Sequence, residues 1–173
     1  MIPSTTDIDI IFEQPVPMGI SKSDTEKVAD LVRSKLGFEP GDDPKKIVER
    51  LGGKIEIQSD LHGKESGTLV VSGNQDFVIY LAPFTSQMHD KFTIAHELGH
   101  YILHSNFGDK KIVVNRSSAS GRLEWEANWF AAALLMPKKQ FLEDCKAGMS
   151  EIELADKYRV SLQAIQVRRK SLG

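Results

Sequence analysis

At the beginning of the chain, a stretch in which apolar and polar residues follow no regular period precedes two segments with the periodicity of a helix. Residues 1–20 contain three prolines and sustain neither a helical nor a strand period, which predicts an irregular arm. Val28, Val32 and Leu36 then place an apolar stripe on one face of a predicted helix, which Gly37 ends. A second, short helix with its own apolar face follows. This part of the chain is therefore expected to supply an arm and two helices.

The pattern then changes to a period of two, as in β-strands. Residues 54–58 alternate between polar and apolar positions, and β-branched or aromatic residues dominate 67–71 and 77–81. The short, turn-forming segment 72–76 predicts that the second and third strands pair as an antiparallel hairpin. We expect the third strand to form an edge of the sheet, where an extended peptide could add as a further strand.

Helical periodicity returns in the second half of the chain. One helix is predicted over 86–104, and after a polar loop over 105–120 a second long helix runs to 136, where a proline interrupts it. Four large apolar residues recur at helical spacing in this second helix, and we interpret them as its core face: Trp125, Trp129, Phe130 and Leu134. Three further short helices are predicted after it.

Composition narrows the class of protein. With 173 residues, of which 40% are hydrophobic and 27% charged, the chain is expected to fold around one main core. The formal net charge of -2 provides no overall cationic field for nucleic acid. A lone cysteine, Cys145, and the lack of an export signal favour a reducing, cytoplasmic location. The longest apolar run, residues 130–136, is far shorter than the roughly 20 residues that a membrane-spanning helix needs.

The segment HELGH, from His96 to His100, carries the strongest chemical signal. Residues four apart on a helix lie one turn above each other, so the two histidines can bind the same metal ion. Glu97 lies one step further round the helix, where it can accept a proton from an attacking water molecule. Gly99 has no side chain, which allows a neighbouring helix to approach closely. Because HELGH also arises by chance, the assignment depends on a third ligand.

A catalytic zinc site needs a third protein ligand, since the fourth position is left to water and substrate. His104 lies roughly 12 Å along the helix axis from His96, which makes it a poor candidate. Glu124 and Glu126 point about 200° apart on the second long helix, so only one of them can face the metal. We favour Glu124, because Asn128 follows it by one turn and can orient a histidine from outside the site. Glu126 is the alternative.

Two coupled motifs resemble the ImmA/IrrE family of bacterial and phage metallopeptidases. They are KFTIAHELGHYILH, residues 91–104, and EWEANWFAAALLMP, residues 124–137. The pair is far more specific than HELGH alone, and the resemblance covers roughly residues 25–173. Residues 1–20 have no recognised counterpart in the family.

The resemblance implies both a fold and a function. It implies an α+β, zincin-like core in which a small antiparallel sheet covers the HEXXH helix. It also implies one zinc ion per chain, bound by His96, His100 and Glu124, with Glu97 as the general base. On this basis we expect a zinc-dependent endopeptidase that cleaves a partner protein. The resemblance points to a helix-turn-helix transcriptional repressor of a mobile element or stress response as that partner.

The expected organisation has three parts. An irregular arm over 1–20 precedes a metallopeptidase domain over 21–147, and a helix-turn-helix-like segment over 148–173 packs on that domain. The basic residues of this segment, among them Arg168 and Arg169, gather at the end of its last helix, whereas groove-reading contacts usually come from the beginning. We therefore favour a docking or packing role for the segment over DNA binding.

A second functional class stays open at this point. Family members include antitoxin-like proteins, so the chain could neutralise a partner without cleaving it, with zinc structural or absent. HELGH supplies metal ligands but does not guarantee a path for a substrate. Cleavage of the cognate partner distinguishes the two classes.

Overall fold

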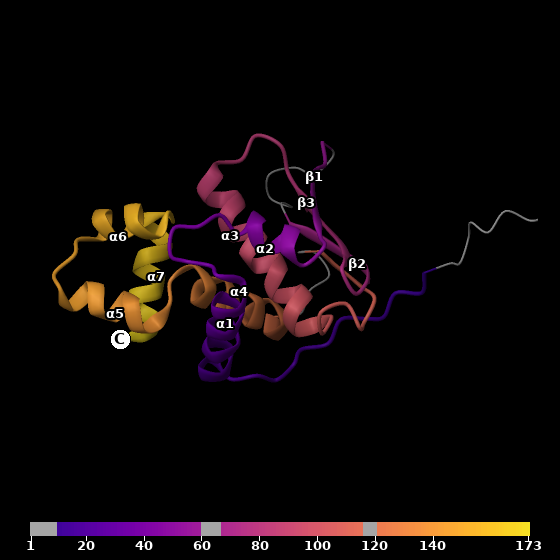
Figure 1. The fold of residues 1–173 in the computed structure, drawn as a ribbon, viewed down its shortest axis with the longest axis horizontal. Coiled ribbons are helices and arrows are strands. Elements are labelled where there is room, and N and C mark those ends of the chain that lie inside the picture. Colours follow the sequence, from indigo (N-terminus) through magenta and orange to yellow (C-terminus); the bar gives the residue numbers. More distant parts are fainter. Residues whose placement is uncertain (1–9, 60–66, 116–120) are drawn as a thin grey trace, which may run out of the picture.

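The computed structural model describes residues 10–59, 67–115 and 121–173. It confirms the expected α+β class, with a four-stranded sheet beside a group of helices (Figure 1). The helices are α1 (Lys22–Leu36), α2 (Lys45–Arg50), α3 (Gln87–Gly99), the π-helical turn η1 (His100–His104), α4 (Gly121–Leu135), α5 (Lys138–Lys146), α6 (Glu151–Tyr158) and α7 (Leu162–Leu172). The strands are β1 (Lys54–Ile57), β2 (Thr68–Gly73), β3 (Asp76–Leu81) and β4 (Ile112–Asn115). Within the described ranges, no helix has the length and apolar character that crossing a membrane requires.

The sheet is mixed rather than wholly antiparallel, with the strand order β1-β3-β2-β4. β2 and β3 form the predicted antiparallel hairpin. β1 pairs with β3 in parallel, and β4 pairs with the other side of β2. The expectation that the third strand forms a sheet edge is therefore wrong. β3 lies between β1 and β2, so its backbone groups are already paired and cannot accept an added peptide strand.

β4 lies inside the predicted polar loop over 105–120. Ile112 and Val114 are buried and alternate with partly exposed neighbours, as expected of a strand with one face on the core. The run is only four residues long, which is too short for periodicity alone to reveal it. The arm lies along this strand, because the backbone N–H of Glu13 donates to the carbonyl of Lys111 at 2.7 Å.

α3 and α4 pack closely at the centre of the molecule (Figure 1). Gly99 permits this approach, because a Cβ atom built on it would lie 3.1 Å from both the Cα atom and the carbonyl oxygen of Ala127 on α4. The predicted packing role of this glycine is thus confirmed. The sheet packs on α3, and α1 packs on α4. The sequence motifs on α3 and α4 are therefore brought together by a contact between two backbones.

α4 divides its large apolar residues between two faces. Phe130 and Leu134 are fully buried, as predicted, whereas Trp125 is 57% exposed and Trp129 is only partly buried. Each pair is spaced by four residues, but at 3.6 residues per turn the two pairs lie about 140° apart on the helix. The interpretation of both tryptophans as core residues is therefore wrong. They belong to a face that the core does not cover.

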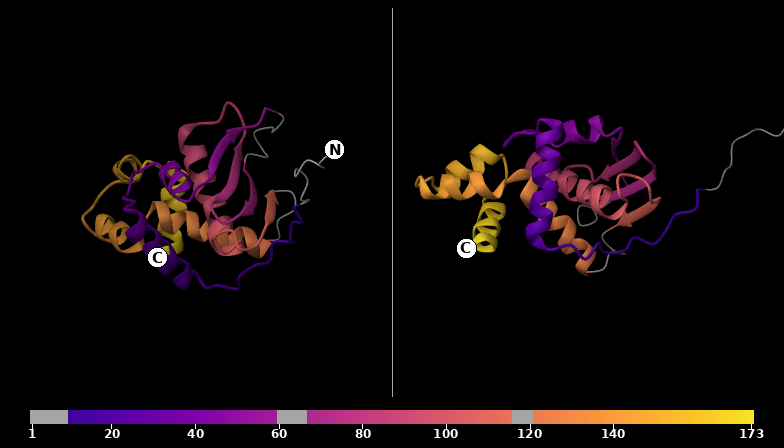
Figure 2. Two further views of the ribbon diagram at one scale, coloured as in Figure 1. Left: turned by 45° about the vertical axis from the view of Figure 1, so that its right-hand side comes forward. Right: turned by 60° about the horizontal axis from the view of Figure 1, so that its bottom comes forward.

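The C-terminal helices gather at the end of the molecule opposite the sheet (Figures 1 and 2). Ser150 begins α6 with a complete capping box, and Ser161 caps α7, as the sequence predicts. Arg168 on α7 is 3% exposed, bonds both carboxylate oxygens of Glu26 on α1, and donates to the carbonyl of Met136 after α4. This basic residue therefore fastens α7 to the helical core instead of facing solvent.

Candidate metal centre

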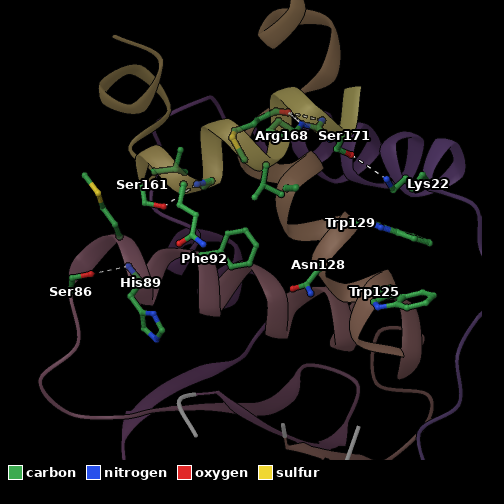
Figure 3. Close-up of a pocket in the computed structure, with 17 residues that line it drawn as sticks. Lys22, Ser86, His89, Phe92, Trp125, Asn128, Trp129, Ser161, Arg168 and Ser171 are labelled. Carbon is green, nitrogen blue, oxygen red and sulfur yellow. Dashed lines mark hydrogen bonds between the residues drawn. The ribbon is translucent and has the colours of Figure 1, made fainter. Parts of the chain in front are cut away.

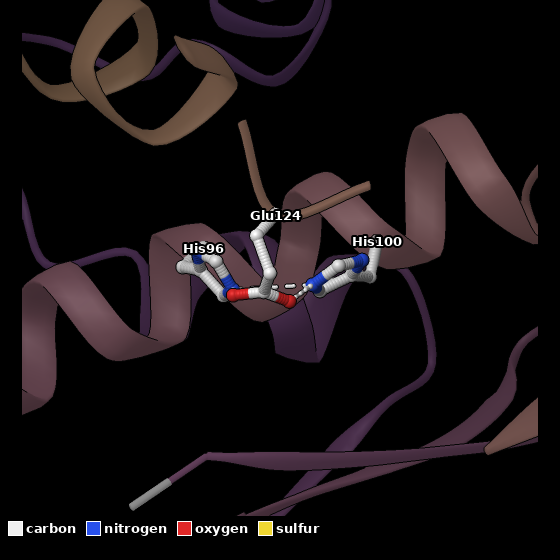
Figure 4. Close-up of side chains that lie close together, drawn as sticks. All are labelled: His96, His100 and Glu124. Carbon is white, nitrogen blue, oxygen red and sulfur yellow. Dashed lines mark hydrogen bonds and ion pairs between the residues drawn. The ribbon is translucent and has the colours of Figure 1, made fainter. Parts of the chain in front are cut away.

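Three side chains from α3, η1 and α4 converge on one point (Figure 4). The Nε2 atoms of His96 and His100 lie 3.1 Å apart. One carboxylate oxygen of Glu124 lies 3.1 Å from Nε2 of His100, and the other lies 3.2 Å from Nε2 of His96. The ligand atoms of all three residues fall within 4.8 Å of one another. We call these residues the metal cluster, because two imidazoles and a carboxylate are a donor set that suits zinc.

Asn128 fixes the orientation of the first histidine. Its side-chain oxygen lies 2.8 Å from Nδ1 of His96. A carbonyl oxygen can only accept, so Nδ1 carries the proton and the lone pair of Nε2 points into the cluster. The expectation that this amide orients a histidine from outside the site is confirmed. The residues present thus fit a metal ion in donor type and in orientation.

The electrostatics of the metal cluster also favour a cation. Burial alone would raise the pKa of Glu124, but hydrogen bonds from His100 and His96 hold it well below its usual value. Burial lowers the pKa of His100 to about 4. Burial alone would also lower the pKa of His96, but its bond to Glu124 and the nearby charge of Glu97 raise it above the ordinary value. A metal ion therefore meets a carboxylate and a His100 ring that already favour their deprotonated, ligating forms, and it competes with a proton at His96.

Glu97, the expected general base, is buried beside the metal cluster. Its Oε1 atom packs against the backbone of Gly67, where a Cβ atom would lie only 2.5 Å away. Gly67 also has a φ angle of 101°, which side chains rarely adopt. A glycine is therefore required where β2 begins, so that the chain can pass over the glutamate. Gly67 was not singled out from the sequence, although a glycine at the start of a strand signals a close backbone approach.

A second histidine and glutamate lie directly behind the metal cluster. His104 and Glu126, here called the buried pair, both have fully buried side chains, and Nε2 of His104 lies 3.0 Å from Oε2 of Glu126. The Nδ1 atoms of His104 and His100 are 2.8 Å apart. The structure thus brings Glu124, and not Glu126, to the two histidines of HELGH. His104 does not belong to this group of candidate metal ligands.

Sequence patterns did not predict the buried pair. Its geometry depends on η1, where the helix widens to i→i+5 bonding, as in the bond from the backbone N–H of Ser105 to the carbonyl of His100. The only available signal was the repeat of a second histidine and a second glutamate in the same two motifs.

A groove of about 710 Å³ lies between α3, α4 and α7 (Figure 3). Its apolar lining includes Phe92, Trp125, Trp129 and Val167. Asn128, which orients His96, also lines it, whereas none of the three residues of the metal cluster does. The described residues that line this groove include no aspartate or glutamate.

Comparisons with known proteins agree with this geometry. Residues 50–170 match the family model Peptidase_M78, described as the IrrE N-terminal-like domain. The Metallopeptidase ImmA of Bacillus subtilis (strain 168) is 35% identical over 87 residues, which cover 49% of this chain and 52% of that protein. The chain therefore spans about half the length of this curated relative.

A solved structure shows a similar fold. A Mycobacterium tuberculosis transcriptional regulator matches with a TM-score of 0.64 and 18% identity, over 86% of this chain and 46% of that protein. At this identity the match speaks for the fold alone. The family model, in contrast, covers well over half of the chain and includes every residue of the metal cluster. The chain belongs to the ImmA/IrrE family of metallopeptidases.

Proposed function

We propose that this protein is a zinc-dependent endopeptidase that hydrolyses a peptide bond in a partner protein. The observation that carries the proposal is the convergence of His96, His100 and Glu124 within 4.8 Å, with Glu97 directly after His96 on the same helix. Three protein ligands leave a position for water and substrate, which distinguishes a catalytic zinc site from a closed structural one. His96, His100 and Glu124 would hold one ion per chain.

The residues around this ion have separate roles in the proposed reaction. When bound, zinc supplies Lewis-acid polarisation of a carbonyl group and acidifies water. Glu97 accepts a proton from the attacking water as the new C–O bond forms, and returns that proton to the amine nitrogen as the C–N bond breaks. Asn128 keeps the His96 ring in its ligating orientation throughout.

The apolar groove between α3, α4 and α7 supports a protein as the partner. Its exposed Trp125 and partly exposed Trp129 offer large apolar surfaces of the kind that anchor protein partners. We propose a helix-turn-helix transcriptional repressor of a mobile element or stress response as the partner, on the strength of the family resemblance. A cytoplasmic location belongs to the same proposal. The inward position of Arg168, which is bonded to Glu26, disfavours DNA binding through α7.

The direct test is incubation of the zinc-loaded chain with the repressor encoded by a neighbouring reading frame, followed by intact-mass measurement. We expect two fragments whose masses sum to the substrate plus one water. Glu97→Gln should keep zinc and partner binding but slow cleavage by about 10² to 10⁴-fold, because only the basic oxygen is lost. Release of repression in cells by Glu97→Gln at the wild-type level would favour the rival function, in which the protein neutralises its partner by binding alone.

A further inference from the structure

We propose that the buried pair positions the metal ligand His100, and that the N-terminal arm holds the buried pair in place. The inference rests on the metal-binding half of the proposed function and assigns roles to His104, Glu126 and the arm. Its test measures metal binding, whereas the proposed peptidase activity is tested by cleavage. The two can therefore fail separately.

The hydrogen-bond chain behind His100 has one consistent arrangement of protons. Nε2 of His100 faces Glu124 and His96, so a metal ion there would require its lone pair and leave the proton on Nδ1. That Nδ1–H donates to Nδ1 of His104 over 2.8 Å. His104 must then carry its own proton on Nε2, and it donates this proton to Glu126 over 3.0 Å. The carboxylate thus selects the tautomer of His104, and His104 in turn selects the ligating tautomer of His100.

Glu126 is itself fixed by more than the histidine. Its Oε2 atom accepts the backbone N–H of Met18 at 2.8 Å, in addition to His104. Its Oε1 atom accepts the N–H of Gly19 at 2.8 Å and Nε of Arg122 at 3.0 Å. Four donors therefore hold a carboxylate whose side chain is fully buried. A buried carboxylate held in this way keeps its charge and cannot rotate away from His104.

The arm is thereby part of the support of the metal cluster. Two of the four donors to Glu126 are backbone groups of the arm, and Arg122 also donates to the carbonyl of Ile20. The matched family model begins at residue 50, so the arm lies outside the matched residues. Glu13 adds a second attachment along β4 through its bridge to Ile112.

The test uses the full chain and three variants, with zinc affinity measured by competition with a chromogenic chelator. His104→Leu keeps the apolar volume but removes both hydrogen bonds, and zinc affinity should fall about 10 to 100-fold. His104→Gln should recover most of that affinity, because an amide has an acceptor for His100 and a donor for Glu126. The visible spectrum of bound Co²⁺ should shift in the Leu variant and return towards the wild type in the Gln variant. Equal zinc affinity in the Leu variant, the Gln variant and the wild type would overturn the proposal.

Glu126→Gln is a second variant that tests the proposal if His104→Leu does not fold. Folding is judged by the melting curve of the metal-free protein. The amide that replaces the Glu126 carboxylate would turn an N–H donor towards groups that already donate, so zinc binding should be weaker in Glu126→Gln than in His104→Gln, which keeps most of the wild-type affinity. Hydrogen exchange at Met18 and Gly19 should accelerate in Glu126→Gln but not in the matched control Glu124→Gln. Wild-type zinc affinity in Glu126→Gln, or unchanged exchange at both arm amides, would contradict the proposed coupling.

Discussion

The metal cluster and the buried pair use the same residue types on the same two helical segments, yet their environments are opposite. Glu124 leaves 24% of its side chain exposed, and its partners are the two imidazole rings of the metal cluster. Glu126, two residues later, is fully buried and accepts four hydrogen bonds from within the chain. One carboxylate has access to a cation from solvent, and the other already has its charge compensated.

This difference shows what separates a metal centre from a structural pair. Residue type is the same in both, so the deciding properties are access to solvent and the number of donors already bound. A carboxylate that faces two converging ring nitrogens gains from a cation, because the lone pairs of all three groups point to one place. A carboxylate surrounded by N–H groups gains nothing from one.

The largest difference is expected in metal content. Glu124→Ala removes one of three ligands, so the purified variant should hold no stoichiometric zinc even after zinc supplementation. Glu126→Ala leaves the ligands in place and should still bind zinc, weakened about 10 to 100-fold. Elemental analysis of both variants beside the wild type measures this. Loss of zinc from Glu126→Ala alone would reverse the assignment of the two glutamates.

In the metal-free protein we expect Glu126→Ala, and not Glu124→Ala, to have the larger effect on the free energy of unfolding. Glu126→Ala strands His104 and the amides of Met18 and Gly19 without an acceptor, which should lower the free energy of unfolding by on the order of 3 kcal/mol. Glu124→Ala removes a group that is partly exposed to solvent and should cost less than Glu126→Ala does. Urea unfolding in the presence of a chelator compares them. A greater loss in Glu124→Ala would mean that the metal cluster, and not the buried pair, stabilises the fold.

Gly67→Ala tests the close approach of the backbone to Glu97. The added Cβ atom meets Glu97 at 2.5 Å, and the φ angle of 101° is strained for alanine, so we expect a stability loss of about 1–2 kcal/mol. Cleavage should slow because Glu97 is displaced, while zinc content stays at the wild-type level. Gly73→Ala is a suitable control, since a Cβ atom there meets nothing within 4 Å. Identical stability in the two variants would refute the close approach over Glu97.

The pH dependence of zinc affinity should report a single proton. Zinc binds neutral imidazole, so affinity should fall about tenfold per pH unit below the pKa of His96, which lies above its ordinary value of 6.5. His100, with a pKa of about 4, should add to this slope only in acid. Zinc titrations from about pH 5 to about pH 8 would reveal the slope. A slope of two protons near neutrality would contradict the view that the other two ligands are already deprotonated.

Local spacing was sufficient to predict most of the metal cluster. The four-residue step from His96 to His100, and the same step from Glu124 to Asn128, are fixed by helix geometry and survive in the fold. The hairpin of β2 and β3 and the caps at Ser150 and Ser161 are local in the same sense. Features that depend only on residues close together in the sequence could therefore be predicted.

Features that depend on distant parts of the chain could not. Whether Trp125 is buried or exposed depends on which face of α4 meets the core, and the periodicity of the sequence is compatible with two apolar faces. The position of β3 inside the sheet depends on β1, which pairs in parallel. The contact of Glu126 with Met18 uses a backbone N–H, which has no signature in the sequence.

The most direct test is X-ray diffraction from crystals of the zinc-loaded chain, recorded at the zinc absorption edge. The account predicts one anomalous peak per chain, within ligand distance of Nε2 of His96, Nε2 of His100 and the carboxylate of Glu124, at about 2.0 to 2.2 Å. It also predicts no peak between His104 and Glu126. A peak at the buried pair, or a fully occupied zinc site elsewhere with none at the metal cluster, would contradict it.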